Sequence, residues 1–343
     1  MSDQAVTSPS EAPDEDERIP QRRQNPVQAL LHQHPALGPL AVLIVAAVVF
    51  DCINTRFFNP ANLSIMLQEV AVIGLLALGQ SIIILTAGID LSVGAAMILA
   101  QMVMAGLAVN SGWPTGLAFV VGLLTGLLTG LVNGVLVTRL HVPPFIATLG
   151  TLGVFTALSI RYANGQTILP SHGSFLLWTG KVITWGTFHL TTGVILMIVL
   201  YIVVGIALGR TAWGKHVYSV GDDLEASRLM GISTTRVLFS VYVTAGLIYG
   251  IAAWVQIGRV GDASTNISST LNLDSITAAV IGGISLFGGR GVVVGTLFGA
   301  LIVQVFQNGL ALAGVQDLYQ ELAEGVLVIA AVSLDQWIRR VRR

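Results

Sequence analysis

Apolar residues follow one another in long runs along most of this chain, without the strict alternation that is typical of half-buried strands. Four stretches contain no Asp, Glu, Lys or Arg: 91–138, 182–209, 237–258 and 291–316. Each stretch exceeds the roughly 20 residues that a helix needs to cross the hydrocarbon of a bilayer. The pattern predicts a polytopic helical membrane protein.

Chain-breaking residues divide the runs into apolar segments, so the sequence predicts an all-α bundle of about ten transmembrane helices. The segments are 39–55, 63–87, 91–109, 113–138, 144–160, 190–208, 236–257, 273–288, 291–312 and 318–337. In an eight-span alternative, 63–109 or 273–312 is partly re-entrant and the two ends keep the same orientation. The segment 165–189 is left unassigned, and a surface loop is compatible with it.

Lysine and arginine residues predict the orientation, because they resist translocation when they lie near span ends. With the N-terminus inside and ten spans, all but four of the 17 lysines and arginines fall on the cytoplasmic side. The four exceptions are Arg56, Arg161, Lys181 and Arg259. We therefore expect both termini in the cytoplasm.

Composition excludes the soluble classes of protein. Of the 343 residues, 54% are hydrophobic and 10% are charged, and the mean hydropathy is +0.79. Soluble domains carry about 25% charged residues, so a soluble enzyme or a nucleic-acid-binding protein is excluded. The 38 glycines favour closely packed helices over a β-barrel.

The two ends of the chain differ from the apolar part. Residues 1–36 contain six acids, three arginines and several prolines, which predicts a disordered acidic cytoplasmic tail. The tail lacks the features of a cleavable signal peptide, so we expect the first span to be retained. Residues 37–338 are predicted to form the transmembrane domain, with a cytoplasmic loop over 209–235, and 339–343 a basic cytoplasmic end.

Glycines recur at every fourth position within the segment 113–138, which places them on one helix face. They are Gly122, Gly126, Gly130 and Gly134. We interpret this face as a helix-packing surface. Leucine at Gly126 or Gly130 is expected to be destabilising, and alanine at Gly130 much milder.

Polar side chains within the predicted spans should face the bundle interior, because their exposure to lipid is costly. They either line a translocation path or form hydrogen bonds between helices, and the sequence does not distinguish these two roles. The candidates are Gln80, Gln101, Asn133, Gln256, Gln304 and Asn308. Asp90 is interpreted as a helix-start cap together with Ser92.

No pattern predicts catalysis, a cofactor or a metal site. Residues 209–216 satisfy GxxxxGK, but His216 replaces the Ser or Thr that would bind magnesium, and the segment follows a span instead of a strand. The six histidines are scattered. We expect neither ATP binding nor enzymatic activity in this chain.

The loop 209–235 carries the strongest functional signal. Asp222 is predicted to be an N-cap, Glu225 to lie at the third position, and Gly231 to end a short amphipathic helix over about 223–230. Several helix-capping residues in one exposed loop favour a docking element over a solvated connector. The residues assigned to it are Gly221, Asp222, Asp223, Glu225, Ala226, Arg228, Leu229, Gly231 and Ile232.

This loop resembles the coupling loop of permease subunits in bacterial ABC sugar importers of the ribose/xylose/galactose type. The similar run is Gly221-Asp222-Asp223-x-Glu225-Ala226-Ser227-x-x-x-Gly231-Ile232. Blocks at 80–94, 133–150 and 276–291 are also similar, and together they cover most of 60–335. Residues 211–223 and 331–339 are most similar to fructose-type permeases. Ser227 stands where alanine is usual, and the acidic tail lies outside the resemblance.

The resemblance implies a set of partners and a cargo. It implies a homodimer of this chain in the bacterial cytoplasmic membrane, separate cytoplasmic ABC ATPase subunits and an extracytoplasmic sugar-binding protein. The cargo would be a monosaccharide such as fructose, ribose or xylose, and no nucleic acid is involved. The alternative is an autonomous secondary transporter or channel for a small polar solute, which would need intramembrane acids; Glu69, Glu321 and Glu324 are its candidates.

Overall fold

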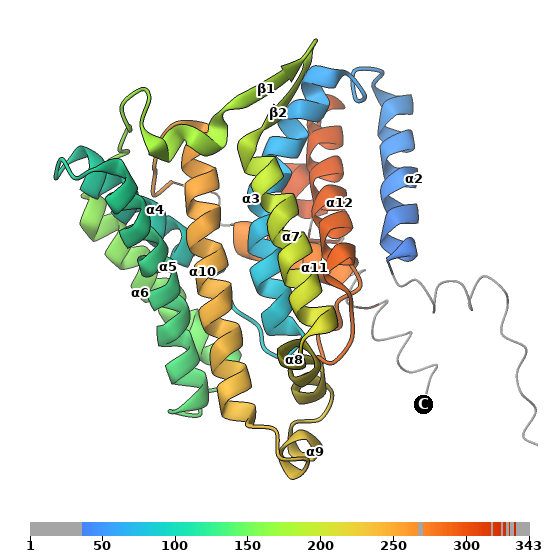
Figure 1. Cartoon of the computed structure of the whole chain (residues 1–343). Coiled ribbons are helices and arrows are strands. Elements are labelled where there is room, and N and C mark those ends of the chain that lie inside the picture. Colours follow the sequence, from blue (N-terminus) through green and yellow to red (C-terminus); the bar gives the residue numbers. More distant parts are fainter. Residues whose placement is uncertain are drawn as a thin grey trace, which may run out of the picture. The chain divides into compact units, whose positions relative to one another are not determined.

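The structure is a computed structural model that describes residues 36–266 and 270–316, with scattered positions between 318 and 333. The tail predicted over 1–36, except Ala36, and the basic end 339–343 lie outside the described residues. So does much of the last predicted span, 318–337. From Ala36 onward the described chain forms helices packed side by side (Figure 1). The predicted helical membrane bundle is confirmed.

Six of the described helices are long and apolar enough to cross a membrane. They are α3 (Pro60–Ile84), α5 (Thr115–Thr138), α6 (Pro144–Ala163), α7 (Thr192–Arg210), α10 (Thr234–Val260) and α12 (Val293–Leu312). Each coincides with a predicted segment to within a few residues. The apolar segments of the sequence therefore locate these helices correctly.

Three further apolar helices are shorter: α2 (Leu37–Ile53), α4 (Val93–Val109) and α11 (Leu271–Ile281). The 11 residues of α11 extend about 16 Å, roughly half of the hydrocarbon thickness. The segment expected to span over 273–288 therefore ends early, in a turn whose Ile284 and Ser285 are buried. The choice between ten and eight spans stays a prediction.

Helix α3 occupies the centre of the described bundle. Its start is set by Asn59, whose side chain accepts a hydrogen bond from Ala61 N at 3.0 Å, and by Pro60 in the first turn. Within its 18-residue apolar window 83% of the residues are buried, because α7, α10, α11 and α12 all pack against it. A helix that is apolar on all sides and enclosed in this way can hold its few polar residues only toward neighbouring helices.

The glycine face of α5 lies against α10 and α4. A Cβ atom built on Gly126 would lie 2.6 Å from the Gly246 carbonyl oxygen and 2.7 Å from Gly250 Cα, both in α10. Gly130 likewise faces Tyr242 and Gly246, Gly134 faces Phe239 and Tyr242, and Gly122 faces Met104 of α4. At Gly126 and Gly130 the nearest atoms are backbone, so the expectation that alanine at Gly130 is mild does not fit this geometry.

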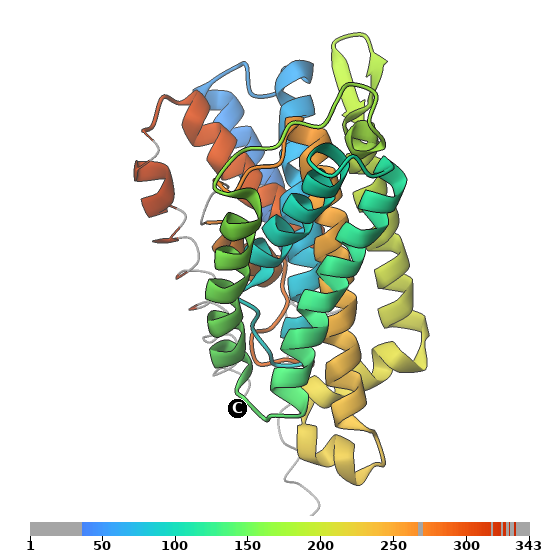
Figure 2. The ribbon, with the colours of Figure 1, turned by 90° about the vertical axis from the view of Figure 1, so that its left-hand side faces the viewer.

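The unassigned segment 165–189 is neither a span nor wholly irregular. It contains a 3-10 helix, η1 (Phe175–Gly180), and a hairpin of β1 (Val182–Trp185) and β2 (Phe188–Thr191). The antiparallel register pairs Val182 with Thr191 and Trp185 with Phe188. The hairpin lies at one end of the bundle, and α9 (Leu224–Leu229) lies at the opposite end (Figures 1 and 2).

Candidate functional site

The predicted helix over about 223–230 is the second of two helices in the loop. Helix α8 (Ala212–Asp222) follows α7 almost directly, and α9 (Leu224–Leu229) follows α8. Asp223, not Asp222, is the N-cap of α9: its backbone is extended and its Oδ1 accepts from Ala226 N at 2.9 Å. The predicted cap at Asp222 is wrong by one residue, because Asp222 is still part of α8 and an N-cap requires non-helical backbone.

Gly231 ends α9 in the left-handed conformation, with φ of 85°. A residue with a side chain is strained there, which is why glycine is common after helix ends. Ser227 is buried and forms a hydrogen bond of 2.8 Å with Ser219 of α8, so α9 is attached to α8 on one side. Its other side faces outward.

The outward side of α9 carries apolar and charged residues together. Leu229 is 88% exposed and Met230 is 68% exposed, Leu224 is also exposed, and Ala226 is half-buried. An exposed ion pair of 3.4 Å joins Glu225 and Arg228 beside them. Leu229 and Met230 together form a small exposed apolar surface at the end of α9.

The end of α8 contacts two turns of the bundle. Gly221 packs so closely on the Leu85 carbonyl at the end of α3 that no side chain fits between them. Gly289 N, in the turn after α11, donates to the same Leu85 oxygen at 3.0 Å. Tyr218 of α8 donates to the Gly291 carbonyl at 2.9 Å, and burial raises the pKa of this phenol, so it stays a neutral donor. The end of α8 is thus in direct contact with the turn after α3 and with the turn after α11.

A cavity of about 550 Å³ lies among α3, α4, α10, α11 and α12. The lining residues of α10 belong to its last turns. Since α9 directly precedes α10, the cavity lies toward the end of α10 that is remote from α9. Its lining residues are Glu69, Val72, Ile73, Gln101, Gln256, Arg259, Val260, Asp262, Ser264, Asn266, Thr270, Leu271, Asp274, Gln304 and Gln307.

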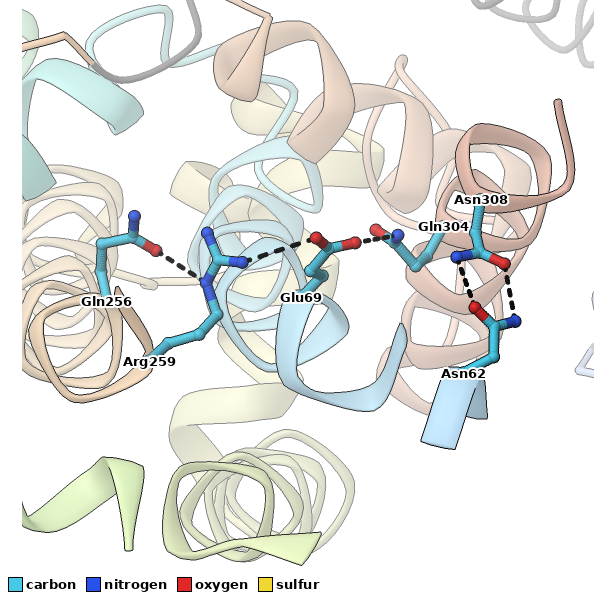
Figure 3. Close-up of polar contacts among 6 residues, drawn as sticks. All are labelled: Asn62, Glu69, Gln256, Arg259, Gln304 and Asn308. Carbon is cyan, nitrogen blue, oxygen red and sulfur yellow. Dashed lines mark hydrogen bonds and ion pairs between the residues drawn. The ribbon is translucent and has the colours of Figure 1, made fainter. Parts of the chain in front are cut away.

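An ion pair between α3 and α10 lies on one wall of the cavity. Glu69 Oε1 is 3.6 Å from the Arg259 guanidinium, and Arg259 Nε donates to Gln256 Oε1 at 3.3 Å (Figure 3). The Gln304 amide of α12 donates to the other Glu69 oxygen. One chain of polar contacts thus connects three helices across the cavity wall.

A second group of polar contacts in the lining involves α11. Asp274 accepts from Thr270 Oγ1 and from Gln307 Nε2, each at 3.4 Å. Gln101 of α4 donates to the Ser264 carbonyl at 2.6 Å. Carboxylates, amides and hydroxyls therefore face this space from every helix that borders it.

The six polar residues proposed from the sequence fall into three places. Gln101, Gln256 and Gln304 line the cavity. Asn308 lies outside it, and exchanges two hydrogen bonds of 2.9 and 3.0 Å with Asn62 (Figure 3). Gln80 and Asn133 belong to a separate buried network around Asp90.

The Asp90 network precedes α4 but does not cap it, because Ser92 at the N-cap position has helical backbone and makes no side-chain capping hydrogen bond. The interpretation of Asp90 and Ser92 as a helix-start cap is therefore wrong. Asp90 Oδ1 accepts from Ser92 N at 2.7 Å and from Ser92 Oγ at 2.6 Å, just before α4 begins. Asn133 donates to Ser92 Oγ and accepts from Thr151, at 2.8 and 2.7 Å. With its amide oriented to satisfy both groups, Gln80 pairs with the Asp90 backbone. Asp90, Gln80 and Asn133 thus do not border the cavity.

The four charged residues of the cavity lining are not among the site residues predicted from the sequence. Arg259 is expected only to be a basic residue on the outer side, and Glu69 to be an interior polar residue and an acid for the alternative transporter. The sequence pattern singles out neither Asp262 nor Asp274. The available signal was the rarity of ionisable residues in apolar segments, which marks functional positions. Within the part of the chain that the structure describes, no group of three metal-ligating acids, histidines or cysteines occurs.

Comparison with known proteins places the chain in a family. The family described as branched-chain amino acid transport system / permease component matches residues 62–332. The chain is 44% identical over 320 residues to the fructose import permease protein FrcC of Rhizobium meliloti, covering 92% of this chain and 89% of the relative.

Two further relatives have similar coverage. Identity is 37% over 302 residues with the ribose import permease protein RbsC of Bacillus subtilis, covering 88% of this chain and 92% of the relative. It is 31% over 316 residues with the galactose/methyl galactoside import permease protein MglC of Haemophilus influenzae, covering 86% and 92%. No solved structure matches the chain. The chain therefore belongs to this permease family: it is a multi-pass, non-enzymatic permease component of a bacterial ABC importer, whose ATPase is a separate subunit.

Proposed function

We propose that this chain is the permease of an ABC importer that carries a monosaccharide across the bacterial cytoplasmic membrane, with fructose as the first candidate. Relatives that match almost the whole chain include permeases named for fructose, ribose and galactose import. The family description names branched-chain amino acids instead, but the cavity favours a polyhydroxylated cargo because most of its lining is polar.

The observation that carries the proposed mechanism is the exposed apolar surface at the end of α9. Leu229 and Met230 offer a small hydrophobic surface at the end of the bundle remote from the cavity. We infer that an ATPase subunit binds α9, and that ATP-driven closure moves α8 and, through Gly221, the turns after α3 and α11. A second copy of the chain would complete the transporter, and an extracytoplasmic binding protein would deliver the sugar.

The alternative, an autonomous secondary transporter, fits less well. Its best acid for ion coupling, Glu69, is already paired with Arg259 and Gln304. Glu321 is exposed, and Glu324 lies outside the described residues. A coupling acid must be free to bind and release its ion, whereas both oxygens of Glu69 already have partners among the described residues.

The proposed orientation, with α9 and both termini in the cytoplasm, predicts which loops are accessible from outside. We would introduce Glu225→Cys in α9 and Thr187→Cys in the hairpin, each in a Cys52→Ser background because Cys52 is exposed. In intact right-side-out vesicles, a membrane-impermeant maleimide should label position 187 and leave position 225 unlabelled. Permeabilised vesicles are the control and should show both labelled. Labelling of position 225 in intact vesicles would contradict the orientation and the docking of a cytoplasmic ATPase.

A further inference from the structure

The cavity has the size of a small-molecule site and a mostly polar lining. Its volume of about 550 Å³ lies within the range of roughly 300–1,000 Å³ found for small-molecule sites. Only Val72, Ile73, Val260 and Leu271 contribute apolar side chains to the lining. A ligand with many hydroxyl groups would find partners on most sides.

The charges of the lining select against anions. Glu69, Asp262 and Asp274 are acidic, and Arg259 is the one basic residue among the described lining residues. The charge of Arg259 is offset by Glu69 at 3.6 Å. The carboxylates of Asp262 and Asp274 therefore dominate the electrostatic field in the cavity. A phosphorylated sugar or a sugar acid would be repelled there, and a neutral sugar would not.

Two buried amides in this lining lack a partner for their oxygens. Gln101 is 0% exposed and Gln304 is 2% exposed, and the amide nitrogen of each already donates, to Ser264 and to Glu69. Neither Oε1 accepts a hydrogen bond from any described residue. A buried acceptor without a donor costs about 1–3 kcal/mol. Both oxygens are covered in this structure, so each amide must turn toward the cavity before a ligand hydroxyl can supply the missing donor.

We propose that this cavity is a binding site for a neutral monosaccharide within the permease itself, in which Gln101 and Gln304 accept hydrogen bonds from its hydroxyls. The proposal rests on sugar import as the proposed function and goes beyond it, since it makes the permease a selective step in addition to any binding protein. In the proposed orientation the cavity lies toward the outer end of α10, where a delivered sugar arrives first.

The test is equilibrium binding of radiolabelled fructose to the full chain in lipid nanodiscs. We expect saturable binding with millimolar affinity, competition by ribose or galactose, and little competition by fructose 6-phosphate or galacturonate. Gln101→Leu and Gln304→Leu should each weaken fructose binding roughly 5–10-fold, since each removes an acceptor. The matched control is Gln68→Leu, the same change on α3 at a residue outside the lining, and it should bind as wild type does.

Each other outcome has a definite meaning. Three results would each overturn the proposed site. The first is that no neutral sugar binds saturably, and the second is that leucine competes as strongly as ribose. The third is that both cavity variants bind fructose with unchanged affinity. Thermal unfolding of the same samples shows whether a variant is folded. If leucine prevents folding, Gln101→Asn and Gln304→Asn provide a second pair that keeps the amide. These two variants should also weaken fructose binding. ATP-driven uptake with the partner subunits is measured in parallel: normal uptake without binding overturns only the site, whereas no sugar uptake by the wild type overturns the proposed function.

Discussion

Leu229→Asp should abolish ATP-driven sugar uptake and association with the ATPase subunit, while the chain still inserts and folds. Leu229 is 88% exposed, so aspartate costs the isolated chain almost nothing. In a complex the same position would be covered, and a central apolar contact is worth about 2–4 kcal/mol, roughly 30-fold or more in affinity. Co-purification of the ATPase and uptake in membrane vesicles would measure the loss.

The matched control at this position is Leu229→Met, which keeps an apolar side chain of similar volume and should retain most of the uptake. Gly231→Pro offers an independent route to the same loss, since proline cannot adopt a φ of 85° and the end of α9 would be displaced. Near-normal uptake in both Leu229→Asp and Gly231→Pro would show that α9 is not the docking element.

Leucine at Gly126 or Gly130 should lower the thermal stability of the protein in detergent and reduce uptake, without lowering the amount inserted. The added side chain would meet the backbone of α10, at 2.6 Å from the Gly246 oxygen in the case of Gly126. Overpacking of this kind costs roughly 1–3 kcal/mol or more, because backbone cannot move aside as a flexible side chain does. Alanine at Gly130 should also be destabilising, contrary to the expectation from the sequence, because its methyl group already meets the Tyr242 carbonyl.

Gly153→Leu in α6 is the control for this pair, since a Cβ atom at Gly153 meets nothing within 4 Å. It should be close to wild type in both stability and uptake. Equal stability of the Gly126→Leu, Gly130→Leu and Gly153→Leu proteins would mean that the α5–α10 contact is not tight in the membrane.

The sequence predicted the long helices well because a single physical requirement, the exclusion of charge from hydrocarbon, acts along each of them. It placed the cap of α9 one residue early because Asp222 and Asp223 are both good capping residues, and only the extension of α8 to Asp222 distinguishes them. The hairpin was not predicted because its strands have four residues each, too few for a clear alternation.

The cavity could not be assembled from sequence because its members lie far apart along the chain. Glu69, Arg259 and Asp274 belong to three different helices, and only their packing brings the three side chains to one space. Glutamines within spans were recognised as interior, but hydrogen bonding between helices and lining a path give the same sequence signal. Helix α12 shows both cases. Asn308 forms hydrogen bonds between helices with Asn62, whereas Gln304 contacts Glu69 in the cavity lining.

The central claim, that a separate ATPase drives sugar through this chain, is tested most directly by uptake of labelled fructose into proteoliposomes. One set contains the chain alone and another contains the chain with its ATPase subunit and binding protein, each with and without enclosed ATP. We predict uptake only in the complete set with ATP, and none above protein-free liposomes for the chain alone, with or without an imposed proton or sodium gradient. Gradient-driven uptake by the chain alone, at a rate that the partners and ATP do not increase, would contradict the account.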